Sequence, residues 1–254
     1  ILTCDTGVTA HDAIDYLREQ GVTVLITDHH DLPPTLPNAH TIVNPKRLPS
    51  DHPLASLPGV GVAYKLIQAL YATADMDATP YLDLVALGIV ADVAVQAHDT
   101  RYLLQSGLER LRHTDRTGLR ALYAVAQIDP LKLTATDIGF QIGPRLNAAG
   151  RLENAAPVVE LLTTRDEGKA QTLAAYLEGL NTDRRVQTQQ ITAAAMDMVS
   201  MNESMLDFEA LVLHHEDWHA GVIGIVASRL GETFQRPVVL LTSSGDDDTA
   251  RGSA

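Results

Sequence analysis

Three side chains that bind protons or metal ions follow one another directly after a hydrophobic run near the start of the chain. The run is TVLIT, residues 23–27, and the three residues are Asp28, His29 and His30. Carboxylate oxygens and imidazole nitrogens together suit Mn²⁺ or a comparable transition ion better than calcium. Such a ligand set also leaves coordination positions open for water and a phosphate oxygen. The pattern therefore indicates a metal site at the end of a buried strand.

Two further aspartates stand at the ends of apolar segments. Asp5 ends the opening run ILTCD, and Asp92 ends the run LVALGIVA. An acid in such a place is destabilising unless something compensates its charge, and one divalent cation would compensate all of these groups. Taken singly, each aspartate fits a cap or a turn residue better. The metal site therefore depends on the three positions together.

A βαβ unit is the element that would bring these groups together. ILTCD and VTVLITDHH have the composition of strands, and residues 9–21 between them have helical periodicity and end on a glycine. A connection of helix length makes the two strands parallel, so their carboxyl ends lie side by side. Ligands of open α/β sheets bind at that edge. We therefore expect Asp5 and Asp28 to line one crevice.

Helical patterns dominate the rest of the chain. A third short strand at residues 41–45 precedes helical patterns at 58–74, 80–94 and 101–114. The glycines of PGVGVAYK match neither GxGxxG nor the Walker pattern, so we interpret this segment as a helix start. Residues 167–201 contain no proline and predict a long helix with one break at Asn181 and Thr182. A strand, a helix and a strand follow from Phe208 and predict a second α/β domain.

Composition limits the class of protein. The 254 residues carry a net charge of −13, hydrophobic residues make up 45 %, and Cys4 is the single cysteine. No apolar stretch reaches the roughly eighteen residues of a membrane helix, and a lone cysteine without a leader sequence favours a cytoplasmic protein. The charge argues against a protein that coats DNA through basic residues. It is compatible with an enzyme that holds phosphates through divalent cations.

The segment IGPRLNAAGR, residues 142–151, is the second informative stretch. Arg145 and Arg151 offer planar donor pairs that suit phosphate oxygens, and Asn147 adds further donors. An alternative of equal weight is that both arginines pair with neighbouring acids, namely Glu153, Glu160 or Asp166. The residues alone leave both interpretations open.

A zinc-peptidase pattern, HExxH, occurs at residues 215–219. The pattern binds zinc only on a helix, where its two histidines share one face. Here it follows the strand-like ALVL and precedes Ala220 and Gly221, so we place it in a loop.

Four motifs in order, TDHHDLPP, GIVADV, IGPRLNAAGR and WHAGVIGIVASRL, resemble the DHH phosphoesterase superfamily and, within it, RecJ-type exonucleases. The resemblance covers nearly the whole chain. It implies an α/β protein with a parallel-sheet DHH domain (1–165), a long connector helix (166–205) and the start of a second, smaller α/β domain of DHHA1 type (206–254). It also implies that the chain is a fragment, with the family's first Asp-x-Asp metal motif upstream of Ile1.

The same resemblance implies roles for the site residues. Asp5 would bridge two Mn²⁺ (or Mg²⁺) ions, His29 and Asp92 would bind one of them, and Asp28 would complete and orient the metal site. His30 would face the scissile phosphate as a fourth catalytic group beside Asp5, His29 and Asp92; the alternative is that it only orders the turn. The implied substrate contacts are Arg145, Asn147, Arg151, His219, Gly221, Arg251 and Ser253, the last two in the closing RGSA, which resembles the family's glycine-serine turn.

The implied activity is a metal-dependent 5′-to-3′ exonuclease that hydrolyses single-stranded DNA in repair and recombination. Without the upstream motif, this fragment would bind one ion weakly and be inactive. The implied partners are single-stranded DNA, a single-strand-binding protein and a helicase, with the protein a monomer. One alternative is a DHH phosphodiesterase for oligoribonucleotides or cyclic dinucleotides. Another is a non-catalytic DNA-binding scaffold, against which the retained ligand residues argue.

Overall fold

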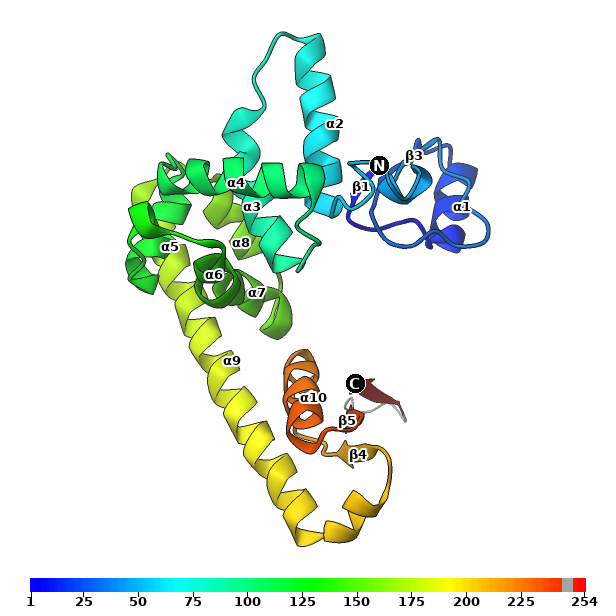
Figure 1. The fold of residues 1–254 in the computed structure, drawn as a ribbon, viewed down its shortest axis with the longest axis vertical. Helices are drawn as coiled ribbons and strands as arrows, with labels where there is room; N and C mark the ends of the chain where they lie inside the picture. Colours follow the sequence, from blue (N-terminus) through cyan, green and yellow to red (C-terminus); the bar gives the residue numbers. More distant parts are fainter. Residues whose placement is uncertain (244–248) are drawn as a thin grey trace. The chain divides into compact units, whose positions relative to one another are not determined.

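The computed structural model describes residues 1–243 and 249–254, and these form two compact units, Ile1–Gly143 (unit 1) and Pro144–Ala254 (unit 2) (Figure 1). The expected α/β class is confirmed, since each unit contains a small sheet flanked by helices. The domain boundaries at residues 165 and 205 stay predictions. Within the described ranges, no helix has the length and apolar character of a membrane span.

Unit 1 begins with the predicted βαβ arrangement. The elements are β1 (Leu2–Cys4), α1 (His11–Glu19), β2 (Leu25–Thr27) and β3 (Thr41–Val43), and the strands pair in parallel in the order β1-β2-β3. Buried Ile14 of α1 packs against Val24 and Ile26, which explains why the alternating apolar residues of this segment form a half-buried strand. Cys4 pairs with Thr27, and Thr27 with Val43, so the residues after these positions share one edge of the sheet.

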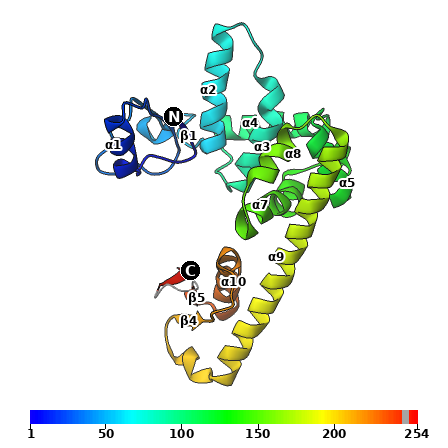
Figure 2. The same ribbon diagram turned by 180° about the vertical axis from the view of Figure 1, so that it is seen from behind.

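Helices form the remainder of unit 1. They are α2 (Gly59–Thr73), α3 (Leu82–Ala91), α4 (His98–Arg112), α5 (Thr117–Ala126) and α6 (Ala135–Asp137), with 3-10 turns η1 (Pro45–Arg47), η2 (Thr79–Tyr81) and η3 (Pro130–Lys132) and a π-helical turn η4 (Ile138–Ile142). Helix α2 begins beside β1, and this is visible from the front in Figure 1 and from behind in Figure 2.

Helix α3 is the most apolar helix of unit 1 and is largely buried against α4. Gly107 permits this packing, because a Cβ there would lie 2.3 Å from the carbonyl oxygen of Leu82. The one buried acid of α3, Asp83, accepts a hydrogen bond from Arg116 Nε at 2.6 Å, which compensates its charge. This fixed helix carries Asp92 at its C-cap.

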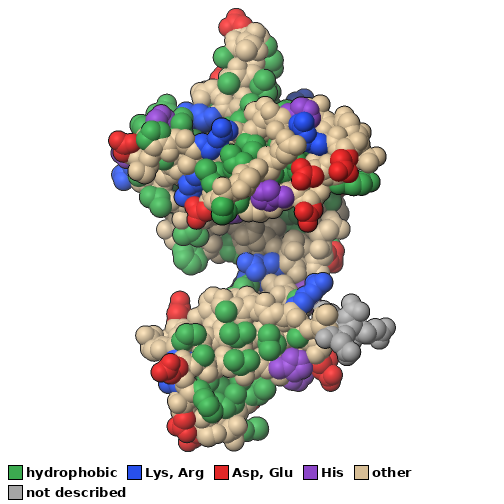
Figure 3. Space-filling view, turned by 90° about the vertical axis from the view of Figure 1, so that its right-hand side faces the viewer, with side chains coloured by type: hydrophobic (Ala, Val, Ile, Leu, Met, Phe, Trp, Pro, Cys, Tyr) green, Lys and Arg blue, Asp and Glu red, His purple; other side chains and the backbone are tan. Residues whose placement is uncertain are grey.

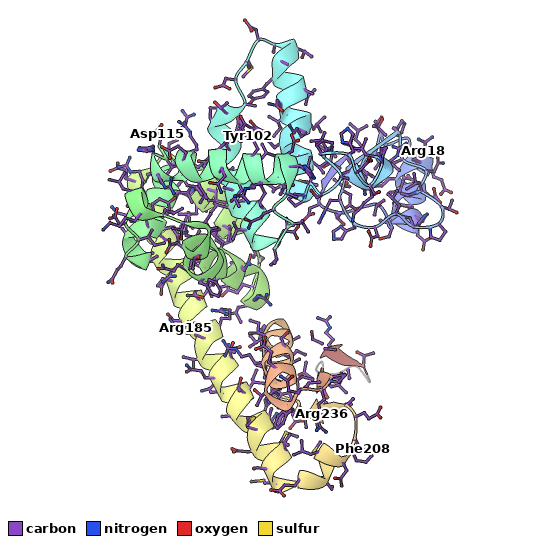
Figure 4. The ribbon with its side chains drawn as sticks, in the orientation of Figure 1. Arg18, Tyr102, Asp115, Arg185, Phe208 and Arg236 are labelled. Carbon is purple, nitrogen blue, oxygen red and sulfur yellow. The ribbon has the colours of Figure 1, made fainter. Side chains whose placement is uncertain are left out.

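Apart from Gly143, which ends unit 1, unit 2 contains the remaining elements. They are α7 (Gly143–Leu152), α8 (Ala156–Thr163), α9 (Glu167–Met201), η5 (Glu203–Asp207), β4 (Leu211–His214), α10 (Ala220–Phe234), β5 (Val238–Ser243) and β6 (Ala250–Ser253). Strand β5 pairs in parallel with β4 and antiparallel with β6. Buried side chains of α9, α10 and the strands form one core that includes Trp218. Arg236 links the end of α10 to the segment before β4, because its Nη1 donates to the carbonyls of Leu206 and Phe208, each at 2.7 Å. Figure 4 labels Arg236 and Phe208.

Two local predictions were wrong. Helix α9 runs for 35 residues without the expected break, because buried Asn181 accepts a hydrogen bond from Arg184 and the hydroxyl of Thr182 donates to the carbonyl of Glu178. Arg251, Gly252 and Ser253 of the closing RGSA lie in strand β6 rather than in a turn, because they pair with β5. The HExxH segment lies in the loop between β4 and α10, as expected.

Candidate metal centre and nucleic-acid contacts

Four predicted catalytic side chains converge at the carboxyl edge of the β1–β3 sheet. His29 Nε2 lies 3.1 Å from Asp5 Oδ1 and 3.9 Å from Asp92 Oδ2. One potential ligand atom from each of Asp5, His29 and His30 lies within 4.8 Å of the other two. The parallel strands and the end of α3 therefore bring together residues that are far apart in the sequence. Histidine (purple) and acidic (red) side chains are visible on the surface of this unit in Figure 3.

This donor set fits a divalent ion. Ligands about 2.1 Å from an octahedral ion lie about 3 Å from their nearest neighbours, and the Asp5–His29 separation of 3.1 Å matches that spacing. The side chains of Asp5 and Asp92 are 55% and 42% exposed, so the cluster opens to solvent and to a substrate. Two carboxylates and an imidazole suit Mn²⁺ or a comparable transition ion.

The carboxylate of Asp28 is bound by hydrogen bonds from within the protein. Its carboxylate is buried and accepts hydrogen bonds from the backbone amides of Val8 (2.9 Å), His29 (2.7 Å) and His30 (3.2 Å) and from His30 Nδ1 (2.6 Å). Burial raises the pKa of Asp28, but these hydrogen bonds together lower it more, so the net pKa is below the usual value. The geometry gives Asp28 an orienting contact to His30, while its predicted role as a metal ligand stays a prediction.

His30 is held at both its ring and its backbone. The hydrogen bond to Asp28 is the largest cause of the raised pKa of His30. The side-chain amide of Asn44 donates to the carbonyl of His30 at 3.0 Å and its oxygen caps the turn η1 through the amide of Lys46 at 2.8 Å. Sequence reasoning missed Asn44. Its place directly after the third strand, at the same sheet edge as Asp5 and Asp28, was the available signal.

Asp5 is fixed by an unusual close approach. Its φ is +62°, a left-handed conformation that aspartate tolerates better than most residues. A Cβ on Gly59, the first residue of α2, would lie 2.0 Å from Asp5 Oδ1. The carboxylate therefore lies against the helix N-terminus, where the helix dipole and amides without intrahelical partners favour negative charge. Gly59 is a second site residue that the sequence reading missed.

In unit 2, Arg145 is bound within the protein. Its Nε forms an ion pair with Glu178 of α9, and the arginine side chain is 13% exposed. The pairing alternative therefore describes its observed contact, although the partner is none of the three acids expected. Asn147 is exposed on α7.

Arg151, His219 and Gly221 come together where α7 ends and α10 begins. Arg151 Nη1 donates to the carbonyl of Gly221 at 3.2 Å, and a Cβ on Gly221 would lie 2.0 Å from the carbonyl oxygen of Arg151. His219 caps α10 by accepting the amide of Gly221 at 3.1 Å. On the next turn of α10, a Cβ on Gly224 would lie 2.8 Å from the hydroxyl of Ser253, whereas Arg251 is exposed on β6.

Further arginines lie near this junction. Burial lowers the pKa of Arg184, and the charges of Arg151, Arg185 and Arg229 lower it further. Figure 4 labels Arg185 on α9. Sequence reasoning assigned no role to Arg184 or Arg185, and the adjacent pair of arginines in a polar helix was the signal for them.

Known proteins are similar to this chain in sequence. Residues 1–89 match the DHH family, N-terminal domain. The Bacillus subtilis protein named single-stranded-DNA-specific exonuclease RecJ is 40% identical over 254 residues, which cover 100% of this chain and 32% of that protein. The Escherichia coli protein of the same name is 40% identical over 100% of this chain and 46% of its own length. The chain thus spans between about a third and a half of these curated relatives.

Solved structures agree with the sequence relatives. Thermus thermophilus RecJ in complex with Mn²⁺ superposes with a TM-score of 0.84 at 34% identity, over 95% of this chain and 36% of that chain. An exonuclease RecJ bound to manganese gives a TM-score of 0.85 at 35% identity, over 95% of this chain and 60% of that chain. Residues 1–89 thus match the DHH family, and over nearly its whole length the chain is similar in sequence and fold to part of the RecJ-type proteins.

Proposed function

We propose that the chain forms part of a metal-dependent exonuclease that hydrolyses single-stranded DNA from its 5′ end. The observation that carries this proposal is the convergence of Asp5, His29 and Asp92, with His30 beside them. The names of the relatives and the Mn²⁺ and Mg²⁺ complexes of solved RecJ structures support the substrate and the metal. The polarity is taken from the resemblance to RecJ-type enzymes.

In this proposal, Asp5, His29 and Asp92 hold a divalent ion. When bound, Mn²⁺ or Mg²⁺ makes water nucleophilic at neutral pH and neutralises charge that develops on the phosphoryl oxygens. A second ion would share Asp5.

Other residues of each unit would orient the substrate. Asp28 engages Nδ1 of His30, so the opposite ring nitrogen, Nε2, is the atom of His30 that meets a phosphate oxygen. Arg151, His219 and Gly221 would contact the strand at the α7–α10 junction, with Asn147, Arg251 and Ser253 as further contacts. A cytoplasmic monomer that works with a helicase and a single-strand-binding protein completes the proposal.

The test is an assay of the complete gene product on single-stranded DNA with a 5′-phosphate, labelled at its 5′ end. We expect Mn²⁺-dependent release of mononucleotides, and loss of turnover in Asp92→Ala with unchanged circular dichroism. Cleavage restricted to dinucleotides would favour the small-substrate alternative. Tight strand binding without any metal-dependent cleavage would favour the scaffold.

A further inference from the structure

Val93, the residue after Asp92, adopts a backbone conformation that valine rarely occupies. Its φ is +52°, in the left-handed region that favours glycine. The other described non-glycine residues with positive φ are Asp5, Asp75, His98, Gln127 and Gln235, and none of these is β-branched. A branched Cβ makes this conformation especially unfavourable.

The end of α3 imposes this conformation. The amide of Val93 donates to the carbonyl of Val90 at 3.1 Å, and the amide of Ala94 donates to the carbonyl of Ile89 at 3.1 Å. These bonds are the helix-ending pattern in which a left-handed residue, usually glycine, follows the C-cap. A valine therefore stands where the backbone geometry calls for glycine.

Packing does not account for the valine. The residue is 87% exposed, so burial of its methyl groups does not offset the strain within the chain itself. Strained residues cluster at functional sites, where a ligand makes use of the conformation. Val93 lies directly beside Asp92, a residue of the candidate metal centre.

A cavity of about 450 Å³ opens at this position, and its lining includes His29, Asp92, Val93, Val95, Leu48 and Lys46. Val95 is 68% exposed and Leu48 is 37% exposed. Residues of the candidate metal centre thus form one end of the cavity. Exposed aliphatic side chains form its wall. A cavity of this size accommodates a small molecule of about the dimensions of a nucleoside.

We propose that this cavity binds the sugar and base of the nucleotide whose phosphate lies at the Asp5–His29–Asp92 cluster, with Val93 as its main apolar contact. The inference rests on the proposed function, since it names the part of the substrate that lies next to the metal centre. A phosphate held by the cluster places its attached nucleoside within reach of the aliphatic wall. Lys46, which pairs with exposed Asp31 at 3.3 Å, supplies a positive charge for a neighbouring phosphate.

The lining also determines the selectivity of this cavity. Among the described lining residues there is no Phe, Tyr or Trp, and the polar side chains outside the metal centre are Lys46, Ser50 and Ser56. Aliphatic contact offers no hydrogen-bonding group that could distinguish one base edge from another. We therefore infer that the cavity accepts all four bases with similar affinity.

Calorimetric titration of the Mn²⁺-loaded 254-residue chain with deoxynucleoside 5′-monophosphates tests this proposal, with inorganic phosphate as the comparison ligand. Val93→Gly should raise the dissociation constant of all four nucleotides by about 5- to 30-fold. The affinities for inorganic phosphate and for Mn²⁺ should stay unchanged. Relief of strain should raise the melting temperature by about 1–4 °C.

Gln127→Gly is the matched control, because Gln127 follows α5 with φ +56° and is exposed in the same unit. It should raise the melting temperature similarly and leave nucleotide binding unchanged. Val93→Ala, which shortens the side chain without adding glycine freedom, should weaken nucleotide binding without that rise.

The outcomes separate this inference from the proposed function. The nucleoside cavity is overturned if wild type and Val93→Gly bind nucleotides with equal affinity. It is also overturned if wild type binds nucleotides no more tightly than inorganic phosphate. Either result leaves the nuclease proposal intact. Valine-dependent nucleotide binding in a protein whose complete gene product has no nuclease activity supports the cavity and overturns the nuclease.

Discussion

The first residue of α2 touches the carboxylate of Asp5: a Cβ on Gly59 would lie 2.0 Å from Asp5 Oδ1. Asp5 also lies 3.1 Å from His29 Nε2, so the same carboxylate joins the helix start to the candidate metal centre. The position of one proposed metal ligand, Asp5, therefore depends on the absence of a side chain at residue 59.

Gly59→Ala should displace the Asp5 carboxylate and weaken Mn²⁺ binding by about 10- to 100-fold, the range typical of changes next to a ligand. Isothermal titration with Mn²⁺ measures this, and circular dichroism checks the fold. Gly61→Ala is the control, because a Cβ there would meet the flexible side chain of Leu57 at 2.9 Å instead of a ligand. Unchanged Mn²⁺ affinity in Gly59→Ala would show that Asp5 does not ligate the ion.

Asp28→Asn should destabilise the protein by about 2–4 kcal/mol, because an amide offers one acceptor oxygen where both carboxylate oxygens now accept hydrogen bonds. The NH₂ group of the asparagine would lie against N–H donors that the carboxylate of Asp28 now accepts from. Urea unfolding gives the free energy. Asp31→Asn is the control, since Asp31 is 94% exposed and its loss should change stability by less than about 0.5 kcal/mol. Equal effects of the two substitutions would contradict the orienting role of Asp28.

Sequence rules predicted the convergence of Asp5 with Asp28 because parallel strands joined by a helix must end at one edge. They could not predict the contact of Gly59 with Asp5, since it depends on where α2 starts relative to β1. The partner of Arg145 was missed for the same reason, because Arg145 lies on α7 and Glu178 on α9, and their contact depends on how these two helices pack. Local patterns predicted the elements, whereas contacts between elements required coordinates.

The helix leading into the IGPRLNAAGR segment should lose stability in acid. Both carboxylate oxygens of Asp137 accept hydrogen bonds, from the amide and hydroxyl of Thr134 and from Gln141, and the bond to the Thr134 side chain is the largest cause of the lowered pKa of Asp137. A lowered folded-state pKa stabilises the protein above the unfolded pKa of about 3.9, and this stabilisation is lost as the pH falls through the folded value.

Asp137→Ala should therefore destabilise unit 1 by about 1 kcal/mol at pH 7, as is usual when a helix cap is removed. The difference from wild type should shrink in urea unfolding at pH values below about 4. Asp115→Ala, an exposed acid that approaches Arg110 at 3.8 Å, serves as the control. A difference that stays constant with pH would contradict the capping contact as its source.

Arg145 and Arg151 lie in one motif but should behave in opposite ways. Arg145 is 13% exposed and paired with Glu178, whereas Arg151 is exposed and donates to the backbone of Gly221. Removal of Arg145 leaves a partly buried carboxylate without its partner, so Arg145→Met should lower stability by about 2–4 kcal/mol. Glu178→Gln in the same chain should recover part of that loss.

Arg151→Met should instead leave stability nearly unchanged and weaken single-stranded DNA binding. Removing one phosphate-binding cation from the complex lowers the dependence of log K on log salt by about 0.7 for a single strand. Fluorescence anisotropy with a labelled oligonucleotide at several salt concentrations measures both effects for the two variants. A weaker salt dependence in Arg145→Met than in Arg151→Met would assign the phosphate contact to Arg145 and make its pairing with Glu178 a feature of the DNA-free protein.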